Sequence, residues 1–268
     1  MSTLTLDPPR GAADVAEATR RTLLFGLAIQ LGLLAPSLLA LGLDDRLLHE
    51  ATVWAKPIKF QSSLVLLLGT LVLLTPLAAP TRGLARAALV VVTASTLEIA
   101  YITLQAARGR ASHYNDQTSI EATMYTLMGV VVLVMVMAVG WIGFRIWRSP
   151  ARPGGEGLRL GAAIGLMLGA ALTLVTAGVL AQGDGHWIEG TSSDAGGLPL
   201  FGWSRTGGDL RVPHFFATHI MQALPLVGFV ADRLAPARAT ALVWIGAGVS
   251  VLVVATTFLQ ALAGRPLL

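Results

Sequence analysis

Glu98 is the strongest candidate for chemistry, because it lies inside a long apolar segment. Ser95 three residues before it, and Tyr101 and Gln105 three and seven residues after it, would form one polar stripe with it on a helix. If the helix runs outward, Glu98 lies about 13 Å below its outer end. A carboxyl group at that depth must be neutral, paired or in contact with water. Such a group suits acid–base catalysis or proton transport, and the plainer alternative is a structural hydrogen bond between helices.

Histidines provide a second source of acid–base or ligand chemistry. His214 and His219 are five residues apart, which separates them by about 140° around a helix and does not match the zincin pair. His219 shares a helix face with Gln222. For His219, an interhelical hydrogen bond, metal or haem ligation, and proton chemistry or substrate contact all remain open. His113, His214 and His219 form the candidate set of metal ligands.

Several cationic and amide side chains are candidates for binding an anionic substrate. Lys56 and Lys59 are three residues apart and would share a helix face near the membrane surface. They are expected to hold a phosphate or carboxylate together with Arg211, although contact with lipid phosphates would explain the lysines equally well. Gln105 and Arg108 border a polar loop that would cover a pocket, and together with Gln222 they complete the predicted substrate-binding set. The alternative is that this loop only forms a turn beside the lipid headgroups.

The sequence excludes several kinds of site. It contains no cysteine, so disulfides, thiolate metal sites and cysteine nucleophiles are absent. No zincin, nucleophile-elbow, P-loop or dinucleotide-binding pattern occurs in its proper context. The formal charge of +4 does not indicate nucleic acid as a partner, because the arginines are scattered through short loops between apolar segments.

The composition indicates that a lipid bilayer surrounds most of the chain. Of the 268 residues, 54 % are hydrophobic and only 13 % are charged, whereas soluble domains carry about 25 % charged residues. We therefore predict an all-α, polytopic membrane protein with one seven-helix transmembrane bundle over 22–268, preceded by a mostly disordered cytoplasmic tail over 1–21. The predicted spans are 22–43, 58–79, 86–107, 122–147, 158–181, 213–231 and 240–263.

The distribution of positive charge predicts the orientation of this bundle. Of the 19 lysines and arginines, 11 fall on the side of the N-terminus and 8 on the other side. The positive-inside rule then places the N-terminus in the cytoplasm and the C-terminus outside. All five histidines and the Gly-rich loop 182–212 fall on the extracytoplasmic side in this topology.

A row of small residues predicts one close helix contact. Gly161, Gly165 and Gly169 recur every fourth residue, a spacing that lets a second helix approach closely. Packing within the bundle is the favoured interpretation, and a homodimer formed through the three glycines is the alternative.

Three sequence blocks resemble those of a bacterial group of uncharacterised seven-span integral membrane proteins. The blocks are WxKPxKF from Trp54, QxxRGxxSHYN from Gln105 and GWSxxGGDLRVPHFxxxHxxQ from Gly202. The resemblance covers most of the chain and implies a seven-span fold in a bacterial cytoplasmic (inner) membrane, but it implies no activity or cofactor. That group carries His-Ala-Val-Gly before the Gly-rich loop. This chain has a different stretch from His186, so the resemblance does not support a role for that histidine.

These features lead to one main functional hypothesis. An extracytoplasmic pocket would bind or chemically modify an anionic amphiphile, such as a lipid or an isoprenoid-like compound, with Glu98 and His219 as catalytic residues. The loop 182–212 would be its lid. Whether the protein is an enzyme remains open. The alternatives are a redox protein that holds haem or a divalent metal through its histidines, and a proton-coupled transporter centred on Glu98. No internal repeat supports the transporter.

Overall fold

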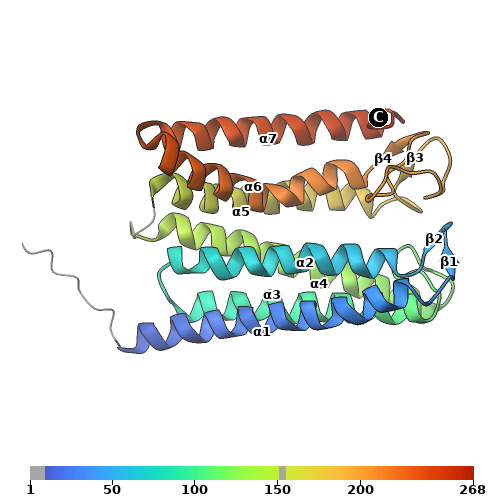
Figure 1. Cartoon of the computed structure of the whole chain (residues 1–268), viewed down its shortest axis with the longest axis horizontal. Coiled ribbons are helices and arrows are strands. Elements are labelled where there is room, and N and C mark those ends of the chain that lie inside the picture. Colours follow the sequence, from blue (N-terminus) through green and yellow to red (C-terminus); the bar gives the residue numbers. More distant parts are fainter. Residues whose placement is uncertain (1–9, 151–154) are drawn as a thin grey trace, which may run out of the picture.

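The computed structural model describes residues 10–150 and 155–268, which form seven long helices (Figure 1). All seven are long and apolar enough to cross a membrane, and this confirms the predicted all-α seven-helix bundle. The helices are α1 (Arg10–Leu41), α2 (Ala55–Leu74), α3 (Arg82–Ala107), α4 (Ser119–Arg148), α5 (Glu156–Leu180), α6 (Arg211–Leu234) and α7 (Ala239–Leu262). Single 3-10 turns, η1 (Thr75–Leu77) and η2 (Pro236–Arg238), follow α2 and precede α7.

The first helix begins earlier than predicted. It starts at Arg10, so the part of the predicted tail from residue 10 onward is helical, whereas residues 1–9 lie outside the described residues. Alanine-rich sequence favours a helix here, and Glu17 accepts a hydrogen bond from Arg21 one turn later at 2.7 Å. The hydrophobic run locates the part that crosses the membrane, but it does not mark where the helix begins.

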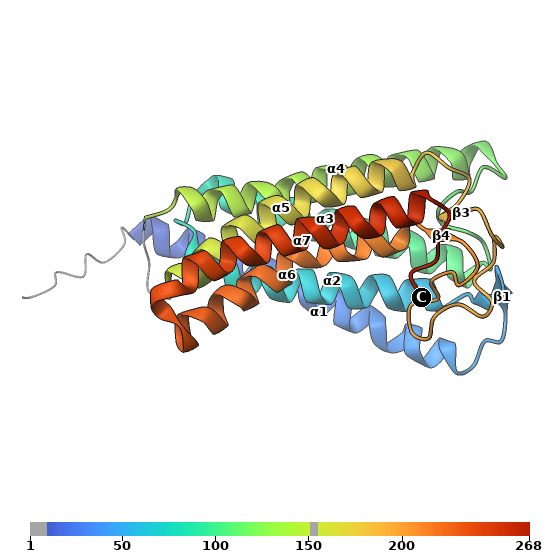
Figure 2. The same ribbon diagram turned by 90° about the horizontal axis from the view of Figure 1, so that it is seen from above.

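The bundle has two parts that meet mainly through α4 and α5. Helices α1–α4 share one apolar core, and helices α5–α7 pack around a second one. Extensive packing joins α4 to α5, whereas α2 and α6 approach each other at only a few positions. Figure 1 shows α5, α6 and α7 grouped on one side of the four other helices, and Figure 2 shows α4 and α5 running side by side.

Loops and two short hairpins gather at one end of the bundle, here called the loop end (Figure 1). It comprises residues 42–54, 108–118 and 181–210, and the C-terminus lies beside it. One hairpin pairs β1 (Leu47–Leu48) with β2 (Ala51–Thr52), and the other pairs β3 (Trp187–Ile188) with β4 (Gly208–Asp209). All five histidines belong to these loops or to the first turns of α6, which begins there.

The glycine row of α5 packs against α6 of the same chain. Gly161, Gly165 and Gly169 are buried, and a Cβ atom at any of them would collide with α6. At Gly161 the colliding atom is the backbone carbonyl oxygen of Leu224, which cannot move aside as a flexible side chain would. The favoured internal packing is therefore what the structure contains. Because α6 already covers this face, a homodimer through the three glycines would require α5 and α6 to separate, and that alternative stays an untested prediction.

We expect Gly161→Ala to lower the free energy of unfolding by about 1–3 kcal/mol, because the new methyl group forces α5 away from α6. Gly178→Ala is the matched control, since no atom lies within 4 Å of a Cβ at that position of the same helix. Unfolding of the two purified variants in detergent, followed by circular dichroism, measures the difference. Equal midpoints would contradict close packing at this row.

Candidate functional site

Glu98 and His113 form the centre of the candidate site at the loop end. The Glu98 side chain on α3 is 3 % exposed, and neither carboxylate oxygen has a hydrogen-bond partner among the residues that the structure describes. His113 places Nε2 at 3.7 Å from Oε1 of Glu98. The Nδ1 atom of the same ring lies 3.1 Å from the hydroxyl oxygen of Ser112. When that hydroxyl donates to Nδ1, the ring proton stands on Nε2 and points toward Glu98.

The surroundings of His113 keep its ring neutral. Burial lowers the pKa of His113 well below its usual value, and the positive charge of Lys56 lowers it further. The rings of Phe60 and Tyr125 each lie 5.7 Å from the imidazole centroid. A neutral imidazole beside a carboxyl group can donate a hydrogen bond or relay a proton, and it does not neutralise the carboxylate charge. Lys56 is therefore the nearby source of positive charge.

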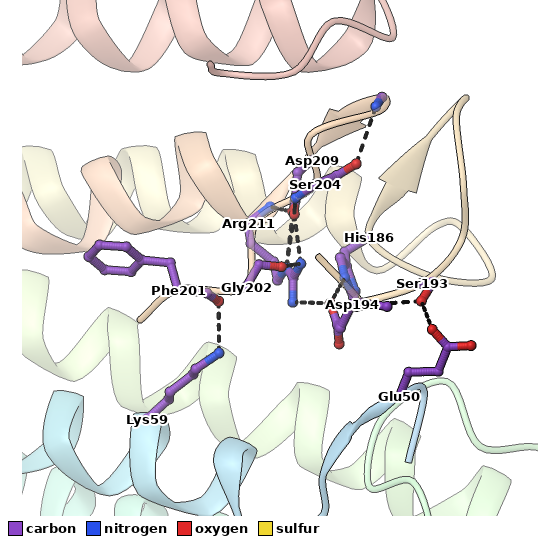
Figure 3. A network of polar contacts seen from close by, with 12 residues as sticks. Glu50, Lys59, His186, Ser193, Asp194, Phe201, Gly202, Ser204, Asp209 and Arg211 are labelled. Carbon is purple, nitrogen blue, oxygen red and sulfur yellow. Dashed lines mark hydrogen bonds and ion pairs between the residues drawn. The ribbon is translucent and has the colours of Figure 1, made fainter. Parts of the chain in front are cut away.

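The two predicted lysines have different surroundings. Lys56 is half-buried in the first turn of α2, with Nζ 5.8 Å from the Phe60 ring centroid. Within residues 10–150 and 155–268, no hydrogen bond or ion pair engages its ammonium group. Lys59 donates a 2.7 Å hydrogen bond to the carbonyl oxygen of Phe201 (Figure 3). Lys56 is thus available to a ligand, whereas Lys59 holds the loop that covers this end.

Gln105 and Arg108 hold the loop that carries His113. The Gln105 amide is fully buried and donates to the carbonyl oxygen of Ala111 at 3.0 Å and to Glu121 at 3.1 Å. Its own oxygen accepts a 2.7 Å hydrogen bond from Arg108. Glu121 also accepts from Arg110 through both carboxylate oxygens. These contacts fix the loop between α3 and α4, and direct binding of substrate by Gln105 or Arg108 stays a prediction.

Arg211 is engaged by the lid rather than left open to a ligand. Its guanidinium lies 2.7 Å from the carboxylate of Asp209 and 2.9 Å from that of Asp194 (Figure 3). It also donates to the carbonyl oxygen of Gly202 at 2.7 Å. Two carboxylates and a carbonyl satisfy most of its donors, so the predicted role in holding an anion would require the lid to rearrange. In the closed structure, Arg211 fastens the loop onto the start of α6.

The lid is also fastened to the first part of the bundle. Ser193 donates a 2.9 Å hydrogen bond to Glu50, which follows β1 (Figure 3). His186 places Nε2 at 3.4 Å from Asp194. Although burial opposes it, His186 and Arg211 together hold the pKa of Asp194 below its usual value. The sequence assigned no role to His186 or Asp194, and both serve the closed lid.

The α6 residues predicted to act in the site contact other groups than Glu98 and His113. His219 donates from Nδ1 to the carbonyl oxygen of Phe215 at 2.8 Å, which leaves Nε2 to accept a proton, and its ring stacks on Phe215 at 4.1 Å. His214 places Nδ1 at 3.1 Å from the hydroxyl oxygen of Thr176 on α5. The amide oxygen of Gln222 is buried without a partner from the protein.

The predicted groupings of these histidines differ from the observed one. Among the described residues, no hydrogen bond or ion pair joins Glu98 to His219, and the imidazole beside Glu98 is that of His113. Nor does any group of three His, Cys, Asp or Glu residues in the described part lie close enough to hold a metal ion. The proposed metal set of His113, His214 and His219 is therefore not brought together. The tertiary position of the α3–α4 loop, which sequence spacing does not reveal, decides which histidine meets Glu98.

Comparison with known proteins adds no assignment, because no family model, no curated protein and no solved structure matches this chain.

Removing the carboxylate of Asp194 should open the lid. Asp194→Asn breaks the charge pairing with Arg211, and hydrogen bonds to charged groups contribute about 1.5–3 kcal/mol, so we expect at least about tenfold faster trypsin cleavage after the exposed Arg205. The lowered pKa of Asp194 means that its contribution is present above the ordinary carboxyl value of 3.8 and is lost as pH falls below it. Asp184→Asn, at an exposed acid of the same segment, should leave the cleavage rate unchanged. Equal rates in all three proteins would contradict the fastening role of Asp194.

Proposed function

We propose that this membrane protein binds the anionic headgroup of an amphiphile at the loop end and exchanges a proton with it through Glu98. The observation that carries the proposal is that both Glu98 oxygens are buried without a hydrogen-bond partner among the described residues, while Nε2 of His113 lies 3.7 Å from Oε1. A buried polar group without a partner costs free energy, and it persists where a ligand, water or a reaction uses it. A purely structural carboxyl group at this depth would be expected to have a protein donor.

The surroundings support an amphiphile rather than a small water-soluble anion. Glu98 lies within a membrane span, and Lys56 stands at the first turn of the neighbouring span. Phe60 and Tyr125 supply aromatic walls beside His113. A molecule whose polar head reaches Lys56 and whose apolar part stays in the lipid satisfies both environments at once. The lid 182–212 then separates the headgroup from bulk water.

Each residue of the pair has a distinct part in the proposed proton transfer. The neutral ring of His113 turns Nε2 toward the Glu98 carboxylate at 3.7 Å, close enough to bias its orientation but too far for a hydrogen bond. Glu98 takes a proton from the ligand, or returns one, at the oxygen that His113 leaves free. Lys56 stabilises negative charge on the ligand without moving, because α2 places it beforehand. His219 and Gln222 would contact the ligand from the α6 wall.

The interior below Glu98 favours binding or catalysis over transport. Toward the opposite end of the bundle, the core between α1, α2 and α3 is apolar and tightly packed, with Leu23, Leu68, Leu71 and Val91 fully buried. Charged groups do not cross such a region without a large rearrangement. The proposed ligand would therefore reach Glu98 from the loop end rather than through the apolar core.

Native mass spectrometry of the purified protein tests the proposal. We expect an amphiphile to co-purify with the wild type and to be reduced at least tenfold in Lys56→Gln, because its anion loses the ammonium partner. Lys59→Gln is the matched control, since its amide can still donate to Phe201 and should retain the ligand. If the protein is an enzyme, the Glu98→Gln variant should still bind the amphiphile but not convert it. The bound molecule should then differ in mass from the one that co-purifies with the wild type. No ligand in any sample, or equal loading of Lys56→Gln, would overturn the proposal.

The distribution of lysine and arginine supports a bacterial cytoplasmic membrane with the N-terminus inside and the loop end outside. Because the chain has no cysteine, Arg205→Cys introduces a single thiol into the lid. A membrane-impermeant maleimide added to intact spheroplasts should label it fully. If the thiol is labelled only after lysis, the orientation is the opposite of the proposed one and the site faces the cytoplasm. Arg82→Cys, at the first residue of α3 and at the opposite end, should give the converse result.

A further inference from the structure

Gln30 on α1 is a buried amide that the candidate site does not yet explain. Its side chain is 0 % exposed, and within residues 10–150 and 155–268 neither its oxygen nor its nitrogen has a hydrogen-bond partner. The amide offers two donors and one acceptor with two lone pairs, so leaving all of them unsatisfied in an apolar bundle is costly. In the neighbouring amide Gln61, the nitrogen donates to Ser37 at 3.0 Å and to the Leu33 carbonyl oxygen at 3.2 Å, and only the oxygen lacks a partner among the described residues.

The register of α1 against α3 places Gln30 near Glu98. Gly26 packs against Val92, whose methyl group would lie 2.6 Å from a Cβ at the glycine. Both helices run toward the loop end, so one further turn brings Gln30 level with Ser95. Ser95 is fully buried, and its hydroxyl donates to the carbonyl oxygen of Val92 at 3.0 Å, which leaves its lone pairs free. Glu98 follows one turn later along the same stripe.

We propose that Gln30, Ser95 and Glu98 enclose ordered water that forms the inner end of the site, with Gln30 as its positioning residue. Water is the ligand that fits, because it donates and accepts at once and needs two to four polar partners. Gln30 supplies both kinds of group, Ser95 supplies lone pairs, and the Glu98 oxygens accept. The water solvates the Glu98 carboxylate in a region where no protein group does so.

None of the described titratable groups around Glu98 forms a hydrogen bond to its carboxylate, so water would have to solvate it. Lys56 faces it from α2 and His113 from the α3–α4 loop, while Tyr101 follows on α3 and Tyr125 stands behind His113 on α4. From α1, the amide of Gln30 is the polar group at this level, and it carries no charge. A role of this water in proton transfer rests on the proposed function. The presence of the water does not depend on whether an amphiphile binds.

Labelling of Glu98 with dicyclohexylcarbodiimide tests the inference without any knowledge of the ligand. This apolar reagent enters the bilayer and modifies protonated carboxyl groups, and mass spectrometry of the Glu98 peptide gives the labelled fraction against pH. Loss of water from the carboxylate disfavours its charged form. We expect Gln30→Leu and Ser95→Ala each to move the labelling midpoint upward by about one pH unit or more, the effect of losing one hydrogen bond to a charged group.

Matched controls separate this effect from a general disturbance. Thr96→Val removes a hydroxyl from the same level of α3 that already donates to Val92 at 2.8 Å, and it should leave the midpoint unchanged. Glu121, which is held by Arg110, serves as the internal reference for misfolding. A midpoint that stays unchanged, or falls, in both Gln30→Leu and Ser95→Ala would overturn the water site. The ligand measurements on Lys56→Gln are independent of that outcome.

Discussion

A carboxyl group buried in the apolar interior of a helical bundle is the constraint on which this structure depends. Burying a charge costs far more than burying an apolar side chain, so the surroundings of Glu98 must offset that cost or keep the group protonated. The protein supplies a neutral imidazole and one ammonium group but no direct hydrogen bond. The buried contacts of Gln105 and Glu121 fix the loop that delivers that imidazole. Much of the polar structure at this end therefore serves to position groups around one oxygen pair.

The positively charged side chains at the loop end have two different roles: some hold the loop in place, and one is available to a ligand. Arg211 and Lys59 close the lid, the first through two carboxylates and the second through a backbone carbonyl. Lys56 has no such protein partner in the described part of the chain. An anion that reached the site would displace nothing from Lys56, whereas binding to Arg211 would require breaking contacts with Asp194 and Asp209. This difference, rather than the number of cations nearby, determines which residue can bind a ligand.

Sequence reasoning located the spans and Glu98 but could not pair the residues of the site. Hydropathy over about 20 residues reports burial in lipid directly, so the seven helices follow from it. Glu98 was recognisable because a carboxyl group in an apolar run is costly wherever its helix packs. Its partner was not, since the conformation of the α3–α4 loop decides that His113 and not His219 lies beside it. The ion pair of Arg211 could have been predicted from the sequence, because Asp209 stands only two residues before it.

The position of Gln30 also bears on why the site opens toward one end. A carrier must let its ion reach both sides of the membrane, so polar groups should continue past the binding site in both directions. Here the polar stripe from the loop end stops at Gln30 and Ser95, and the next turns of α1 and α3 meet through Gly26 and Val92. Closely packed apolar side chains exclude water more completely than loosely packed ones. The polar stripe thus ends on its inner side at Gln30 and Ser95, an arrangement that suits a site where a headgroup enters, exchanges a proton and leaves by the same route.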